Sequence, residues 1–135
     1  MTKPRLAGID HAHLNVGSKD EARRWYQDVL GFAPVESLKA WDTPNGPMTL
    51  EDASGRIHLA IFEKPGPANE SSIAFGTDGA NFLEWKSHLQ RKGLELRLAD
   101  HELAYSVYFS DPWGNYHEVT TYDRDFVAER IDAWR

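Results

Sequence analysis

Three short segments of this chain carry side chains that can ligate a metal ion or transfer a proton. Near the start, IDHAHLNV contains His11 and His13; the middle segment GRIHLAIF contains His58; and DPWGNYHEV contains Glu118. Imidazole and carboxylate groups bind hard and borderline divalent ions, and the same groups act as general acids and bases. The chain has no cysteine, which excludes thiolate ligands and a thiol nucleophile. Any metal site must therefore use His, Asp and Glu, and Glu118 is its candidate carboxylate.

A tight turn precedes Glu118 and sets its direction. The turn-forming residues are Asp111, Pro112, Gly114 and Asn115, and we interpret them as turn chemistry alone. The turn leads directly into a predicted strand, so an acidic side chain close to its start is held in a defined orientation. Trp113 at this turn and Trp41, in a loop predicted over 41–47, are candidate walls of a pocket.

The elements that position these residues follow a duplicated plan. Residues 9–32 and 73–94 each read as strand, helix, glycine and strand. The predicted helix starts and stops are Ser18 and Gly31 for the first helix, and Asp78 and Gly93 for the second. The two stop glycines are about 60 residues apart, and the recurrence of the same order of elements at this offset indicates an internal duplication.

Three short strand-like runs follow each helix, so the pattern is βαβββ twice. These runs cover 33–38, 48–52 and 56–62 in the first copy, then 94–98, 105–110 and 116–122 in the second. We predict one α+β domain over 1–135, with modules at about 8–64 and 71–122 and a Pro- and Gly-containing linker between them. An amphipathic helix is predicted over about 123–134, with an apolar face of Phe126, Val127, Ile131 and Trp134.

Strand alternation sorts the side chains onto two faces, because successive residues point to opposite sides of a sheet. One face of each strand is apolar and is expected to pack under the helices. The other face carries His11, His13 and Asn15; His58 and Phe62; Ser72; Ser106 and Tyr108; and Tyr116, Glu118 and Thr120. A second face that is neither helix-covered nor wholly charged favours a sheet curled around a pocket. By the same alternation His117 points away from Glu118 and is structural.

Composition and charge narrow the classes of partner. With 135 residues, 41% hydrophobic and 27% charged, the chain suits one compact globular domain. The formal net charge of -6 and the lack of a clustered basic patch argue against a nucleic-acid partner. The sequence contains no long apolar run, so we predict neither a signal peptide nor a membrane span. We expect a cytoplasmic protein that acts on a small molecule.

The opening IDHAHLNV, the helix ending WYQDVLGF and the closing YFSDPWGNYHE resemble the vicinal oxygen chelate superfamily. That superfamily groups glyoxalase I, bleomycin-resistance proteins, fosfomycin-resistance enzymes and extradiol ring-cleaving dioxygenases. The resemblance covers nearly the whole chain. It implies paired βαβββ modules whose mixed sheet curls into a half-barrel with helices on the outer face. It also implies a divalent metal ion on the inner strands and a homodimer.

Carried over by position, the resemblance implies metal ligands at His11, His58 and Glu118. At the first strand of the second module, where many relatives have a histidine, this sequence has Ser72, whose hydroxyl is a weak ligand. His58 restores two imidazoles and one carboxylate, the facial arrangement that leaves coordination positions open. His13 is the other possible substitute. The ligand set leaves Fe, Mn, Zn and Ni open.

Two functions follow from the resemblance. The first is a metalloenzyme of the glyoxalase or dioxygenase type, in which the ion chelates a substrate through neighbouring oxygens. Ring cleavage, lyase or isomerase chemistry and thiol transfer all fit. Tyr108 and His13 are the candidates for proton transfer. The candidate substrate contacts are Asn15, Phe62, Ser72, Ser106 and Trp113. The alternative is a metal-free dimer that binds a small molecule, as bleomycin-resistance relatives do.

Overall fold

The computed structural model describes residues 3–66 and 72–133, which belong to two compact units that divide after Gly66. Each unit has a four-stranded mixed sheet and its own helices. The predicted α+β class and the repeated βαβββ pattern are therefore confirmed. Within the described residues neither sheet closes into a barrel, because each one ends in two outer strands.

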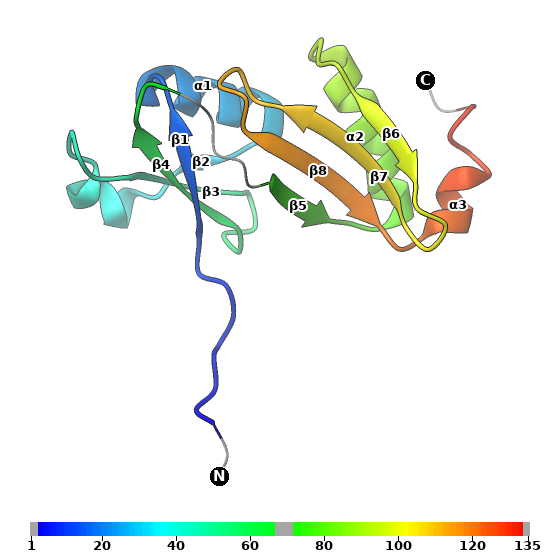
Figure 1. Ribbon diagram of the computed structural model, residues 1–135, viewed down its shortest axis with the longest axis horizontal. Helices are drawn as coiled ribbons and strands as arrows, with labels where there is room; N and C mark the ends of the chain where they lie inside the picture. The colour runs from blue at the N-terminus through cyan, green and yellow to red at the C-terminus, as the bar shows by residue number, and fades with distance from the viewer. Residues whose placement is uncertain (1–2, 67–71, 134–135) are drawn as a thin grey trace. The chain divides into compact units, whose positions relative to one another are not determined.

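The first unit places its first and last strands side by side. Its elements are β1 (Ala12–Val16), α1 (Lys19–Leu30), β2 (Ala33–Pro34), the 3₁₀ helix η1 (Glu36–Trp41), β3 (Met48–Glu51) and β4 (His58–Glu63). The sheet order is β1-β4-β3-β2, with β1 parallel to β4 and the other pairs antiparallel. Figure 1 shows β1 and β4 as neighbouring arrows.

Helix α1 covers the apolar face of the first sheet. Ser18 Oγ accepts a hydrogen bond from the Glu21 amide at 3.2 Å, and Gly31 ends the helix with a left-handed φ of 77°, so the predicted start and stop are confirmed. The buried apolar residues on the two sides are Ala22, Tyr26, Val29 and Leu30 from α1, and Leu14, Val16, Met48, Leu50, Leu59 and Ile61 from the strands.

The second unit repeats this topology. Its elements are β5 (Ser72–Gly76), α2 (Gly79–Arg91), β6 (Arg97–Asp100), β7 (Tyr105–Ser110), β8 (Tyr116–Thr121) and α3 (Arg124–Ala128). The order is β5-β8-β7-β6, and β5 is parallel to β8. Asp78 Oδ1 accepts from the Asn81 amide at 2.8 Å, and Gly93 follows α2 with φ 79°. Both predicted signals for this helix are confirmed.

A histidine lies inside the second hydrophobic core. Phe82, Leu89, Val107 and His117 are all fully buried. The His117 ring packs near two phenylalanine rings, with centroid distances of 5.9 Å to Phe75 and 5.5 Å to Phe109. Burial lowers the pKa of His117 to about 4, because the apolar surroundings disfavour the charged imidazolium. The imidazole is therefore neutral at pH 7.

Two elements of the first unit differ from the prediction. The first strand begins at Ala12, because the ladder with β4 starts at the pair Ala12 and Leu59; His11 lies just before it. The strand predicted over 33–38 pairs only at 33–34 and then turns into η1. Local hydrogen bonding explains the change, since the Leu38 amide donates to Val35 O at 3.1 Å instead of continuing the sheet.

The C-terminal helix is shorter than the pattern predicts. Helix α3 spans Arg124–Ala128, and residues 129–133 continue as turns. Trp134, which was expected on its apolar face, lies outside the described residues. None of the described helices combines the length and apolar character needed to cross a membrane.

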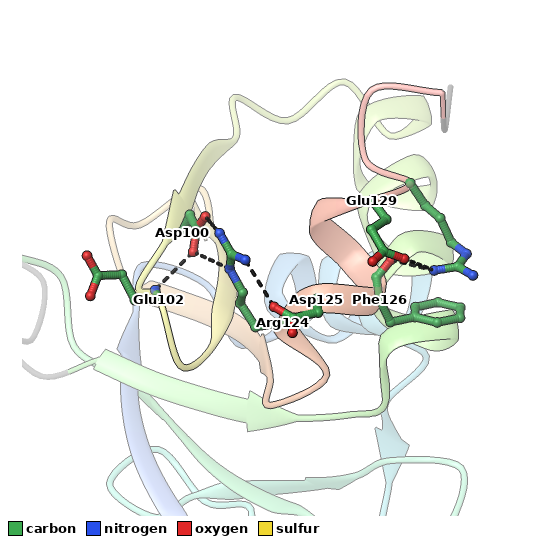
Figure 2. A network of polar contacts seen from close by, with 7 residues as sticks. Asp100, Glu102, Arg124, Asp125, Phe126 and Glu129 are labelled. Carbon is green, nitrogen blue, oxygen red and sulfur yellow. Dashed lines mark hydrogen bonds and ion pairs between the residues drawn. The ribbon is translucent and has the colours of Figure 1, made fainter.

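Polar contacts tie α3 to its neighbours within the second unit. Asp123 Oδ2 accepts the Gly79 amide proton at 2.8 Å. Arg124 Nε donates to Asp100 Oδ1 at 2.9 Å, and the same guanidinium contacts Asp125, as Figure 2 shows. The hydrogen bond from Arg124 lowers the pKa of the Asp100 carboxyl to about 2. With Val127 fully buried, tertiary contacts hold a helix too short to be stable alone.

Gly79 sits where α2 and α3 touch, and we predict that Gly79→Ala destabilises the fold. A Cβ at this position would lie 2.7 Å from Phe126 Cδ1 and 2.9 Å from Asp123 Cβ. Overpacking of this kind costs roughly 1–3 kcal/mol and should exceed the gain in helix propensity. Urea denaturation measures the change. Gly76→Ala is the matched control, because its Cβ would enter open space. Equal stability of Gly79→Ala and wild type would contradict the close contact.

The buried imidazole predicts a loss of stability in mild acid. Unfolding returns His117 from a pKa of about 4 to its ordinary value of 6.5. Between these values the unfolded chain takes up a proton that the folded chain excludes, so stability falls as pH falls from about 6.5 to about 4. The contribution over the whole window is on the order of 3 kcal/mol.

Urea denaturation at several pH values in this window tests the effect. His117→Phe lacks the titrating group and should show a shallower pH dependence than wild type, whatever constant offset the new ring adds. Parallel pH profiles for the two proteins would show that the imidazole does not cause the acid sensitivity.

Candidate functional site

The face of the first sheet that points away from α1 carries the candidate residues of the first module. Its side chains are His13 and Asn15 of β1, Thr49 and Glu51 of β3, and His58, Ala60 and Phe62 of β4. His11 lies directly before β1 and continues the same alternation. We call this surface the histidine face of the first sheet.

His11 and His13 lie against each other on the histidine face. Their Nε2 atoms are 2.8 Å apart and their rings stack with centroids 4.8 Å apart. The ring of His13 also contacts Phe62 at a centroid distance of 5.0 Å. His11 Nδ1 donates to Asp10 Oδ2 at 2.7 Å, and this hydrogen bond lowers the pKa of Asp10. With Nδ1 protonated, His11 offers Nε2 as its lone-pair atom.

A second carboxylate, that of Glu51, pairs with His58 on the histidine face. His58 and Glu51 are directly opposite each other in the β3–β4 ladder. Their Nε2 and Oε2 atoms are 3.2 Å apart, and both side chains are half-buried. A carboxylate beside an imidazole fixes the orientation of the ring and favours one tautomer. His11 and His58 are therefore each oriented by an acidic neighbour.

His11 and His58 line one cavity of about 110 Å³ in the first unit. The other lining residues are Asp10, Leu38, Trp41, Pro47, Thr49 and Ala60, so the expected wall residue Trp41 does border it. Within the described part of the first unit, no three His, Asp or Glu side chains form a group that would hold a metal ion unaided. The cavity brings together two of the three predicted ligands; Glu118 belongs to the second unit.

A larger cavity of about 490 Å³ adjoins η1 in the same unit. Leu38 and Thr49 line both this cavity and the one beside the histidines. Two of the three cations that line the larger cavity have acidic partners: Lys19 Nζ donates to Asp42 Oδ1 at 2.7 Å, and Arg23 is paired with Asp20 at 2.8 Å. Lys39 and Glu36 complete its charged lining, so cationic and acidic side chains are present there in equal number.

Glu118 lies on the polar face of the second sheet. The register places Ala74, Glu118, Tyr108 and Arg97 in one row across β5, β8, β7 and β6. Glu118 and Tyr108 are half-buried. His117 points to the opposite, buried side, so the predicted separation of Glu118 from His117 is confirmed.

The row ends in a cluster of aromatic rings and one cation. The Arg97 guanidinium lies 4.1 Å from the Tyr108 ring centroid, and its NH2 donates to the Tyr116 hydroxyl at 3.3 Å. The two tyrosine rings stack with centroids 5.7 Å apart, and His101 Nε2 lies 2.9 Å from the Tyr108 hydroxyl. A cavity of about 420 Å³ opens here, lined by Glu95, Leu96, Arg97, Tyr108, Phe109, Ser110 and Tyr116.

The remaining candidates occupy different environments. Ser72 is exposed on the outer strand β5, opposite Tyr116 in the ladder. Ser106 is fully buried and donates to Thr120 Oγ1 at 2.9 Å, so its hydroxyl already has a partner inside the sheet. Asn15 and Trp113 are half-buried. Their contacts with a substrate stay predictions.

Three residues of the candidate site were not predicted from the sequence: Asp10, Glu51 and Arg97. Strand alternation could have indicated Glu51 and Arg97, because each lies on the polar face of its strand. Glu51 alternates with Thr49 in β3, and Arg97 starts β6 in register with Tyr108. Asp10 was detectable only as the acidic neighbour of His11. Sequence spacing does not show which charged side chain reaches which ring.

We predict that Asp111→Ala destabilises the turn that leads into β8. The buried Asp111 carboxylate accepts from the Trp113 amide at 2.9 Å, the Asn115 amide at 2.8 Å and Asn115 Nδ2 at 2.8 Å. Leaving these donors unsatisfied should cost about 2–4 kcal/mol in unfolding free energy. Asp111→Asn retains an acceptor oxygen and serves as the milder control. An unchanged urea midpoint for Asp111→Ala would show that the turn does not depend on these bonds.

Comparison with known proteins agrees with this architecture. The family model described as Glyoxalase/Bleomycin resistance protein/Dioxygenase superfamily matches residues 8–119. No curated protein matches significantly. Among solved structures, a Bacillus anthracis protein provisionally placed in the glyoxalase family is 25% identical, with a TM-score of 0.67 over 89% of this chain and 98% of its own.

Two further structures show the same fold at lower identity. Lactoylglutathione lyase from Agrobacterium tumefaciens is 24% identical, with a TM-score of 0.70 over 87% of this chain and 96% of its own. The fosfomycin resistance protein FosX from Listeria monocytogenes, solved with Mn(II) and sulfate, is 16% identical, with a TM-score of 0.66 over 94% and 99%. Because the family model spans most of the sequence, this chain belongs to the Glyoxalase/Bleomycin resistance protein/Dioxygenase superfamily.

Proposed function

We propose that this protein is a metal-dependent enzyme that acts on a small molecule through two neighbouring oxygen atoms of the substrate. The ligands in this proposal are His11, His58 and Glu118. The observation that carries it is the cavity in the first unit that His11 and His58 line together. Glu118, on the polar face of the second sheet, is the proposed carboxylate.

The donor chemistry of these residues fits a divalent ion. Asp10 accepts a hydrogen bond from Nδ1 of His11, so the lone pair of Nε2 is the one that would bind the metal ion. Glu51 lies beside His58. Such carboxylate partners strengthen imidazole ligands. Two imidazoles and one carboxylate suit Fe, Mn, Zn or Ni. The Mn(II) bound to the Listeria relative makes manganese the first ion to test.

When bound, a divalent ion supplies Lewis-acid stabilisation of negative charge on substrate oxygens. The residues of the chain supply the rest. In this proposal the half-buried Tyr108 and the exposed His13 exchange protons with the substrate. Asn15, Phe62, Ser72 and Trp113 contact it. Ring cleavage, isomerisation or lyase chemistry, and thiol transfer are the reaction classes this arrangement can serve.

A second candidate function is a metal-free homodimer that binds a small molecule. The contact between Nε2 of His11 and Nε2 of His13 favours it, because these imidazoles then satisfy each other without an ion. Ser72 also favours the metal-free function, because many relatives have a histidine at this position. A homodimer is proposed for both functions, and sedimentation velocity measures it.

Metal loading separates the two functions, and we predict about one ion per chain. Untagged protein is stripped with a chelator, desalted and offered Mn(II), Fe(II), Zn(II) or Ni(II) in turn. Elemental analysis after a second desalting measures the bound ion. His11→Ala, His58→Ala and Glu118→Ala should each weaken binding of the preferred ion by at least about tenfold, since ligand loss exceeds the effect of losing a ligand's partner.

The control is His88→Ala, which removes an imidazole from α2. It should load like wild type, and circular dichroism checks that all variants fold. A wild-type protein that retains none of the four ions would refute the metalloenzyme and favour the metal-free binding protein. Unchanged loading of Glu118→Ala would remove Glu118 from the ligand set.

A further inference from the structure

We infer that Arg97, Tyr108 and Tyr116 form a subsite for an aromatic carboxylate, so that the small molecule bound by this protein carries a planar ring with an anionic group. The inference rests on the proposed function for the identity of the face as a small-molecule site, but it does not require the metal.

The cation of this subsite is held in place before any ligand arrives. The Arg97 guanidinium stacks on the Tyr108 ring at 4.1 Å and is hydrogen-bonded to the Tyr116 hydroxyl at 3.3 Å. His101 in turn contacts the Tyr108 hydroxyl at 2.9 Å. A guanidinium fixed by stacking loses little conformational freedom when it binds an anion, and its planar donors match a carboxylate.

Arg97 also lacks the carboxylate partner that four other described arginines have. Arg23, Arg24, Arg124 and Arg130 each contact a carboxylate within 3.5 Å. Among the described residues no carboxylate forms an ion pair with Arg97, and tyrosines alone account for the interactions that raise its pKa. Although Glu95 also borders this cavity, it forms no ion pair with Arg97, and a cation held on aromatic rings without such a pair favours an incoming anion.

The surroundings select a flat apolar group beside that anion. The cavity of about 420 Å³ at this cluster is bordered by both tyrosines, and Tyr116 is 37% exposed. An exposed ring that already stacks on a second one offers a surface for a third aromatic group, since offset-stacked rings attract. A simple inorganic anion would use the guanidinium and leave this surface empty.

The subsite is close enough to Glu118 to share a ligand with it. Glu118, Tyr108 and Arg97 are in register on β8, β7 and β6. Neighbouring strands are about 4.8 Å apart, so Arg97 stands roughly 10 Å from Glu118. A molecule the size of a substituted benzoic acid spans that distance. Its carboxylate would bind Arg97 while the remainder of the molecule reaches the row that contains Glu118.

Nuclear magnetic resonance titration of chelator-stripped, desalted protein with benzoate tests the subsite. We expect benzoate to shift the Arg97 side-chain Nε–H signal and the backbone signals of Tyr108 and Tyr116. Benzamide, which has the same ring without the charge, should bind at least about tenfold more weakly, and so should inorganic phosphate. Arg97→Gln should raise the benzoate Kd at least about tenfold, and Arg97→Lys should recover part of the loss because it keeps the charge but not the planar fork.

Arg130→Gln is the matched control, because Arg130 also stacks on an aromatic ring, that of Phe126 at 3.8 Å, but is paired with Glu129. It should bind benzoate like wild type. The subsite is refuted if benzoate and benzamide bind alike, if phosphate binds as tightly as benzoate, or if Arg97→Gln behaves like Arg130→Gln.

The two proposals fail separately. Benzoate binding at Arg97 in a wild-type protein that takes up no metal would support the subsite and refute the proposed metalloenzyme. Metal uptake through His11, His58 and Glu118 without any benzoate response at Arg97 would support the metalloenzyme and refute the subsite.

Discussion

The parallel pairing of the first and last strand in each module is the constraint on which the other features depend. Parallel neighbours cannot be joined by a tight turn. The chain between β1 and β4, or between β5 and β8, must therefore leave the sheet, form a helix and return through two more strands. The register of these pairs sets which side of each sheet the helix covers. A shift of one residue would turn His13 toward α1 and Leu14 toward the open side.

Much of this organisation was predictable because it depends on local patterns. The caps at Ser18 and Asp78 and the stop at Gly31 act within a few residues. The apolar alternation in β4, β7 and β8 is equally local. The change from strand to η1 was not predictable, because the Val35 amide still donates to Thr49 O of β3 while the Val35 carbonyl accepts from Leu38, and a local pattern does not show where the chain leaves the sheet.

The candidate site is harder to predict than the fold because it depends on cross-strand partners. Alternation correctly placed His58 and Glu118 on polar faces. It did not show that Glu51 stands opposite His58, since that pairing depends on how the chain turns between β3 and β4. It also could not show that Arg97 stacks on Tyr108 rather than pairing with Glu95. The polar faces of the two modules differ accordingly: imidazoles beside carboxylates suit a cation on the first, and a guanidinium on tyrosines suits an anion on the second.

The two cavities beside η1 have two lining residues in common. Leu38 and Thr49 border both the small space next to the histidines and the larger one near Lys19. Leu38 therefore contributes a side chain to the wall of each cavity. The volume available next to His11 and His58 can therefore change through substitution at position 38 while both imidazoles and their carboxylate partners stay in place. The size of the molecule that fits beside the two imidazoles is thus set separately from the groups that would bind it.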